Sequence, residues 1–72
     1  MKFSFDEVNE LLKQQEIRIY SQDIYKSLSS LRLLVKSKDR KIIMDIMSFI
    51  NSIGNEAIEN IEDMIEGNKN DD

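Results

Sequence analysis

Apolar residues recur at steps of three and four through the C-terminal half of this 72-residue chain. Such steps keep side chains on one side of an α-helix, so they predict a long helix with one continuous apolar stripe. A chain this short has little else to cover the stripe, and we expect it to contact another protein or a second copy of the chain. The predicted interface residues are Ile43, Ile46, Met47, Ile50, Ile53, Ala57, Ile58, Ile61, Met64 and Ile65.

The composition favours helices and association. The sequence contains no proline and two glycines, so it has few turn signals of the kind that separate short strands. A single core is marginal in a chain this small, and disulfides, metals or association commonly add the missing stability. Cysteine and histidine are both absent, which removes disulfides and the commonest transition-metal ligand. Association is therefore the source of additional stability that remains for this chain.

A capping box marks the start of the first predicted helix. The hydroxyl of Ser4 can accept from a free backbone N–H, while the Glu7 carboxylate reaches back to the N–H of Ser4. The apolar residues that follow mark one helical face and predict a helix over about 5–15. They are Phe5, Val8, Leu11 and Leu12.

A second helix is predicted over about 22–36 from apolar residues at steps of four and three. Before it, the segment 14–21 has no clear helical pattern, and we interpret it as a connection with Ile17 and Tyr20 tucked inward. Ser21 then serves as the N-cap of the second helix.

The third predicted helix covers about 40–66 and carries the stripe. Gly54 disfavours a helix at this position, but the apolar residues keep the same three-and-four spacing on both sides of it. A glycine inside a helix costs only about 1 kcal/mol relative to alanine. We therefore expect one continuous helix that ends at Gly67. The sequence predicts a single helical domain over 1–67 and a disordered acidic tail over 68–72.

The expected fold is all-α, with two short helices and one long C-terminal helix. The short helices form an antiparallel pair, and the long helix pairs with its counterpart in another subunit, giving a dimeric helical bundle.

Charge is distributed unevenly although the net charge is −4. Acidic residues crowd the C-terminal helix, where Glu59, Glu62, Asp63 and Glu66 share one face that we interpret as solvated. A basic cluster precedes the stripe and could neutralise nucleic-acid phosphates. Apolar residues follow it almost at once, whereas a recognition helix needs polar groups that reach base edges. The cluster comprises Lys36, Lys38, Arg40 and Lys41.

The sequence lacks the parts of an active site or a metal site. The serines have no histidine base, and the two glycines are too far apart for a phosphate-binding loop. No calcium-loop pattern is present, and carboxylate di-iron sites need histidine. We expect no enzyme activity, no metal and no cofactor.

The sequence therefore predicts a small non-enzymatic protein-interaction module, an adaptor, inhibitor or regulatory subunit that acts as a homodimer. Its expected partners are itself and another protein. Neither a membrane span nor a signal peptide is apparent, so we expect a cytoplasmic protein. The alternatives are a DNA-associated transcriptional regulator that uses the basic cluster, and an assembly or scaffolding factor.

Overall fold

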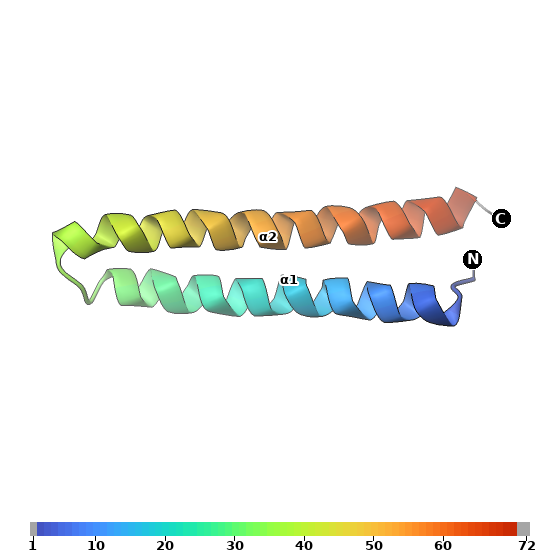
Figure 1. Ribbon diagram of the computed structural model, residues 1–72, viewed down its shortest axis with the longest axis horizontal. Coiled ribbons are helices and arrows are strands. Elements are labelled where there is room, and N and C mark those ends of the chain that lie inside the picture. Colours follow the sequence, from blue (N-terminus) through green and yellow to red (C-terminus); the bar gives the residue numbers. More distant parts are fainter. Residues whose placement is uncertain (1, 71–72) are drawn as a thin grey trace.

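The chain folds as a helical hairpin in a computed structural model that describes the backbone of residues 2–70 and the side chains of residues 2–67. Helix α1 spans Phe5–Arg32 and helix α2 spans Ser37–Asn70. The two helices run antiparallel in a rod of 54 × 16 × 13 Å (Figure 1). The all-α prediction is confirmed. The prediction of three helices is wrong, because the two short helices are one.

Helix α1 begins at the predicted capping box. The backbone N–H of Ser4 donates to Oε1 of Glu7 at 3.1 Å, and the backbone N–H of Glu7 donates to Oγ of Ser4 at 3.2 Å. Asp6 also lies in the first turn, where the positive end of the helix dipole favours an acid. The start of the first helix was therefore predictable from four residues.

The connection predicted over 14–21 is wrong, because α1 runs through it without a break. Nothing in this segment stops a helix: it holds no glycine or proline, and glutamine, glutamate and arginine favour helices. Tyr20, predicted inward, is 61% exposed. Ser21 is not an N-cap but a buried residue in the middle of α1.

The turn between the helices covers residues 33–36, so α1 ends earlier than the predicted boundary at residue 36. The N–H of Leu34 donates to the carbonyl of Leu31 at 2.9 Å, which tightens the end of the helix. The carbonyl of Lys36 accepts from the N–H of Asp39 at 2.9 Å, which starts α2. A connection this short requires α2 to return alongside α1.

Helix α2 is continuous through Gly54, as predicted, and continues beyond Gly67 to Asn70. The prediction that Gly67 ends the helix is therefore wrong. Residues 68–70 of the predicted tail belong to α2, whereas 71–72 lie outside the described residues.

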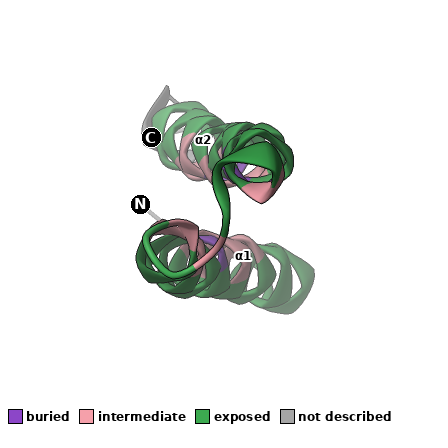
Figure 2. Cartoon of the chain, turned by 90° about the vertical axis from the view of Figure 1, so that its left-hand side faces the viewer, coloured by how far each residue is buried: buried purple, intermediate pink, exposed green. Residues whose placement is uncertain are grey.

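The two helices meet along a seam. On each helix, the seam residues are spaced alternately three and four positions apart. Figure 2 looks along the rod and shows the buried and half-buried residues on the facing sides of the helices. This spacing is that of an antiparallel coiled coil. The seam of α1 consists of Leu11, Gln14, Arg18, Ser21, Tyr25, Leu28 and Arg32, of which Tyr25 is 40% exposed. The seam of α2 consists of Ile43, Met47, Ile50, Gly54, Ala57, Ile61 and Met64.

The seam corrects the predicted role of the stripe. The long helix was expected to pair with its counterpart in another subunit, but α1 of the same chain already covers the centre of the stripe. The long α1 supplies enough length to do so, which two short helices could not. None of the helices within residues 2–70 is long and apolar enough to cross a membrane.

Small and polar residues occupy the middle of the seam. Ala57 is only 1% exposed, and Gly54 lies directly opposite Ser21. Farther towards the chain ends, Nδ2 of Asn60 donates across the seam to Oε1 of Gln14 at 3.2 Å. The apolar part of the core lies nearer the turn, at the buried side chains of Ile43 and Met47. The helices are therefore held by a narrow, mixed contact.

Candidate functional site

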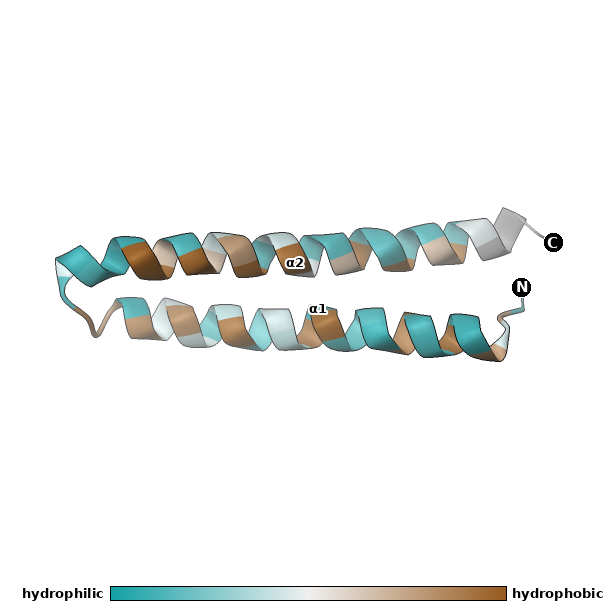
Figure 3. Ribbon diagram, viewed as in Figure 1, coloured by the Kyte–Doolittle hydropathy of each residue, from teal (hydrophilic) through white to brown (hydrophobic). Residues whose placement is uncertain are grey.

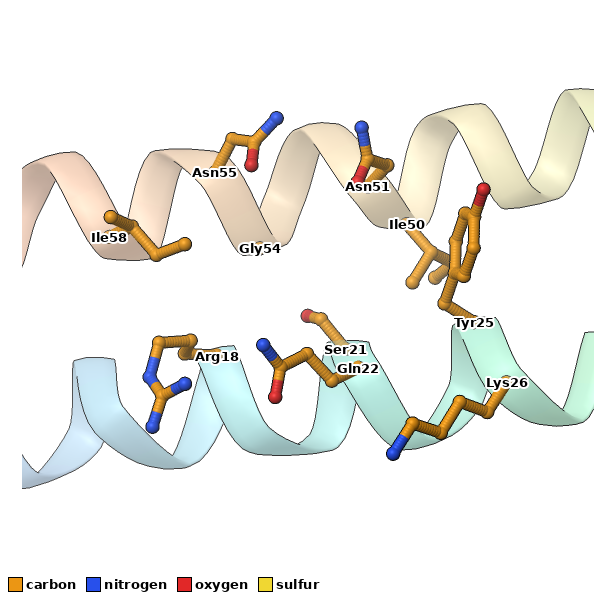
Figure 4. Close-up of a pocket in the computed structure, with 10 residues that line it drawn as sticks. All are labelled: Arg18, Ser21, Gln22, Tyr25, Lys26, Ile50, Asn51, Gly54, Asn55 and Ile58. Carbon is orange, nitrogen blue, oxygen red and sulfur yellow. The ribbon is translucent and has the colours of Figure 1, made fainter.

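One side of the hairpin carries a shallow groove of about 320 Å³ along the seam (Figure 4). Its outer residues each follow a seam residue by one position in the sequence. They are Gln22, Lys26, Asn51, Asn55 and Ile58. This arrangement shows that, on both helices, the position after a seam residue faces the same side of the hairpin.

The two basic residues of the groove, Arg18 and Lys26, do not point towards a common binding site. Figure 4 shows the side chains of Arg18 and Lys26 extending over α1, away from α2. Nε of Arg18 donates to Oε1 of Gln15 at 3.1 Å, so this guanidinium is engaged on its own helix. The groove therefore presents amides and an apolar floor to solvent, and its two cations do not converge on one point.

The opposite side of the hairpin is apolar. Positions that precede a seam residue must face away from the groove on both helices, because consecutive residues lie about 100° apart around a helix. Eight such positions hold large apolar or aromatic side chains, which we call the apolar face. They are Ile17, Tyr20, Ile24 and Leu31 of α1, with Ile42, Ile46, Phe49 and Ile53 of α2.

Most of the apolar face is open to solvent. Six of its side chains are between 43% and 66% exposed, and Ile17 and Ile53 are half-buried. The face occupies the half of the rod nearest the turn, where Figure 3 shows strongly hydrophobic turns on α2. Towards the other end the same line continues with polar residues, which are Glu10, Lys13, Glu56, Asn60 and Asp63. The apolar face is thus a patch with a polar boundary, and patches of this kind mark interaction sites.

The hairpin separates charge along its length. Residues 20–55, in the half with the turn, carry six basic side chains and three acidic ones. Residues 2–19 and 56–67, in the half with the chain ends, carry nine acidic and three basic ones. Folding brings the acidic start of α1 beside the acidic end of α2 (Figure 1). One end of the rod is therefore positive and the other negative.

The predicted basic cluster lies together at the turn. Lys36 is in the turn itself, and Lys38, Arg40 and Lys41 lie in the first turns of α2, all four exposed. A surface hollow of about 340 Å³ beside them is lined in part by Arg32 and Arg40. The cluster is thus a contiguous basic tip of the rod.

The predicted acidic row is a solvent-exposed surface of α2. Glu59, Glu62, Asp63 and Glu66 are all exposed. Within the described part of the chain, no group of three acidic side chains is placed to hold a metal ion.

The ten residues predicted to form a subunit interface divide into three groups. Ile43, Met47 and Ala57 are buried against α1. Ile46 and Ile65 are exposed and free to contact a partner. The others are half-buried at the seam or its edge: Ile50, Ile53, Ile58, Ile61 and Met64. Only Ile46 and Ile53 of the ten belong to the apolar face.

Six residues of the apolar face were not predicted as interface residues: Ile17, Tyr20, Ile24, Leu31, Ile42 and Phe49. A signal for them exists in the sequence, since each lies one position before a member of a three-and-four repeat. The repeat in α1 includes glutamine, arginine and serine, so a search for apolar residues alone does not find it.

The chain has no match among protein-family models, curated proteins or solved structures at the significance applied to each comparison.

Proposed function

We propose that this protein is a non-enzymatic protein-interaction module whose binding surface is the apolar face. The observation that carries the proposal is the imbalance between core and surface. Among the described residues, three apolar side chains are buried, while fifteen large hydrophobic ones are exposed. Six of these fifteen belong to the apolar face and lie on one side of the rod, as a docking surface requires.

The free energy available from burying these apolar side chains supports the binding of a partner to this face. Full burial of a large apolar side chain is worth about 1.5–3 kcal/mol, and most of this remains unrealised at the apolar face. A 72-residue chain with so small a core is marginally stable alone. An amphipathic helix or helix pair would fit, since helices present apolar side chains at the same steps of three and four.

A non-enzymatic role agrees with the groove. The chain has no histidine or cysteine, and the polar residues of the groove do not include a nucleophile paired with a base. We therefore propose a function in binding, as an adaptor, inhibitor or regulatory subunit.

Two matched substitutions test the surface. Ile46→Glu puts a charge on the apolar face, whereas Asn51→Glu puts the same charge on the exposed groove side of the same helix. We expect Ile46→Glu to abolish self-association in sedimentation and capture of host proteins in pull-downs, with Asn51→Glu behaving as wild type. Equal behaviour of the two variants would contradict the proposal. Circular dichroism confirms that both variants remain helical.

A second candidate function uses the basic tip. Folding collects Lys36, Lys38, Arg40 and Lys41 at one end of the rod, away from most of the acidic residues, and this supports contact with nucleic-acid phosphates. Base-specific recognition has less support, because Ile42 and Met44 of the same helix are exposed and apolar.

A further inference from the structure

Phe49 lies near the middle of the apolar face, which extends on α2 from Ile42 to Ile53. Phe49 is the most exposed residue of the face, at 66%. Ile42 lies seven residues before it and Glu56 seven residues after it, so all three project from the same side of α2. A twofold axis through Phe49 and perpendicular to the rod would place Ile42 of one copy opposite Glu56 of the other.

We propose that the occupant of the apolar face is a second copy of this chain, packed antiparallel, with α2 against α2 and the twofold axis beside Phe49. This inference rests on the proposed function, because it names the partner of the same surface. The axis lies close to the middle of the face, since α1 contributes residues 17–31 and α2 contributes residues 42–53 alongside them. Each copy then covers the central part of the other's apolar face, with Phe49 against Phe49 and Ile42 opposite Glu56 at the edge.

Charge complementarity favours an antiparallel orientation of the two copies. With the axis at Phe49, residues 36–42 of one copy run beside residues 56–62 of the other. The first segment carries Lys36, Lys38, Arg40 and Lys41 with one acid, and the second carries Glu56, Glu59 and Glu62 with no base. Glu62 follows the seam residue Ile61 and faces the groove side, so Glu56 and Glu59 are the acids nearest the second copy. The interaction occurs twice in a symmetric dimer.

The opposite packing is unfavourable. If the twofold axis ran along the rod, α2 would lie against α1 of the second copy and the two basic tips would meet at the same end. The acidic ends would also meet, so like charges would face each other at both ends of the dimer. The apolar face alone permits either packing, and the charges select the antiparallel one.

Disulfide trapping tests this geometry directly, because the chain has no cysteine of its own. Three single-cysteine variants replace positions on the same line of α2: Phe49→Cys, Ile42→Cys and Glu56→Cys. The control is Asn51→Cys, which lies at nearly the same height as Phe49 but on the groove side. A disulfide requires Cα atoms about 4.4–6.8 Å apart, so it reports close pairs only.

The antiparallel dimer predicts a specific pattern on non-reducing gels. Phe49→Cys forms covalent dimers with itself, whereas Ile42→Cys alone and Glu56→Cys alone do not, because along α2 their copies lie about 21 Å apart. A mixture of Ile42→Cys and Glu56→Cys forms the mixed disulfide. Asn51→Cys stays monomeric on the gel.

Other results would overturn the inference. Efficient self-crosslinking of Ile42→Cys would place the axis elsewhere, and absence of the mixed disulfide would exclude the antiparallel register. A monomeric wild-type protein would also contradict it. If such a monomer still captured host proteins and lost them in Ile46→Glu, the proposed function would stand and only the identity of the partner would fail.

Discussion

Ser21 of α1 and Gly54 of α2 face each other in the middle of the seam, and a Cβ atom added to Gly54 would lie 3.3 Å from the Cβ of Ser21. This separation is tighter than most real contacts between such atoms, so the glycine permits the approach of the two helices. Gly67, in contrast, has no atom within 4 Å of the position of an added Cβ. The two glycines of the chain therefore differ in role.

Substitution of the two glycines should have opposite effects. Gly54→Val adds bulk against Ser21, and we expect it to lower the free energy of unfolding by about 1–3 kcal/mol, as overpacked cores do. Gly67→Ala should raise it by up to about 1 kcal/mol through helix propensity. Urea denaturation at one fixed protein concentration measures both. A Gly54→Val protein as stable as wild type would show that the seam can widen freely.

The hydrogen bond between Asn60 and Gln14 should contribute measurably to stability. We expect Asn60→Ala and Gln14→Ala each to lower the free energy of unfolding by about 0.5–1.5 kcal/mol. Because both remove the same bond, the double variant should lose less than the two single losses together. Asn55→Ala, at the exposed rim of the groove, is the control and should change little. Strict additivity would show that the bond contributes nothing.

Thermal stability should depend on protein concentration. Association stabilises the folded chain by mass action, so the Tm of the wild type should rise as its concentration increases. Ile46→Glu should have a lower Tm with no such dependence. Ile50→Glu is a poor test of association, because Ile50 is half-buried in the seam and its loss would unfold the hairpin itself. A wild-type Tm that does not change with concentration would argue for a monomer.

Charge reversal should weaken the dimer, and mixing should restore it. Lys38→Glu with Lys41→Glu places acids opposite the acidic segment of the second copy, and Glu56→Lys with Glu59→Lys does the converse. Each double variant alone should dissociate more readily than wild type, while an equimolar mixture should form a heterodimer. Sedimentation measures the affinities, and the recovery on mixing should decrease as salt screens the charges. A mixture that remains dissociated would refute the complementary pairing.

Binding to DNA should be weak and independent of sequence. If the basic tip contacts phosphates, the Arg40→Ala Lys41→Ala variant should lower the slope of log affinity against log salt by about one for each lost contact. We expect moderate salt to abolish the binding of the wild type. Measurements on host DNA fragments at low and moderate salt provide the test, and tight sequence-selective binding would favour the second candidate function.

Sequence patterns predicted the helical class, the start of α1 and the continuity of α2, because each depends on local interactions. The break in α1 was predicted wrongly for a physical reason. Ile17 and Ile19 alternate as in a strand, but in α1 they lie on different sides of one helix, with Ile19 41% exposed. An isolated strand is not stable without a second strand to pair with, so this alternation alone does not predict a strand.

The seam and the apolar face were harder to predict because they depend on what each helix meets. Ser21 belongs to the seam only because a glycine, Gly54, lies opposite it. A polar residue in a core contact is visible only when its neighbours across the interface are known. The apolar face is likewise visible only when both helices are placed. It forms because one line of apolar side chains from α1 and one from α2 lie on the same side of the hairpin.

The uneven composition of the seam has a consequence for the order of folding. The buried residues Ile43 and Met47 lie in the part of α2 near the short turn of residues 33–36, so packing them against the end of α1 costs little loop-closure entropy. The contact between Gln14 and Asn60 closes a much longer loop and adds a hydrogen bond rather than apolar burial. The hairpin should therefore nucleate at its turn and zip towards the chain ends, which gives it the low contact order of fast-folding helical proteins.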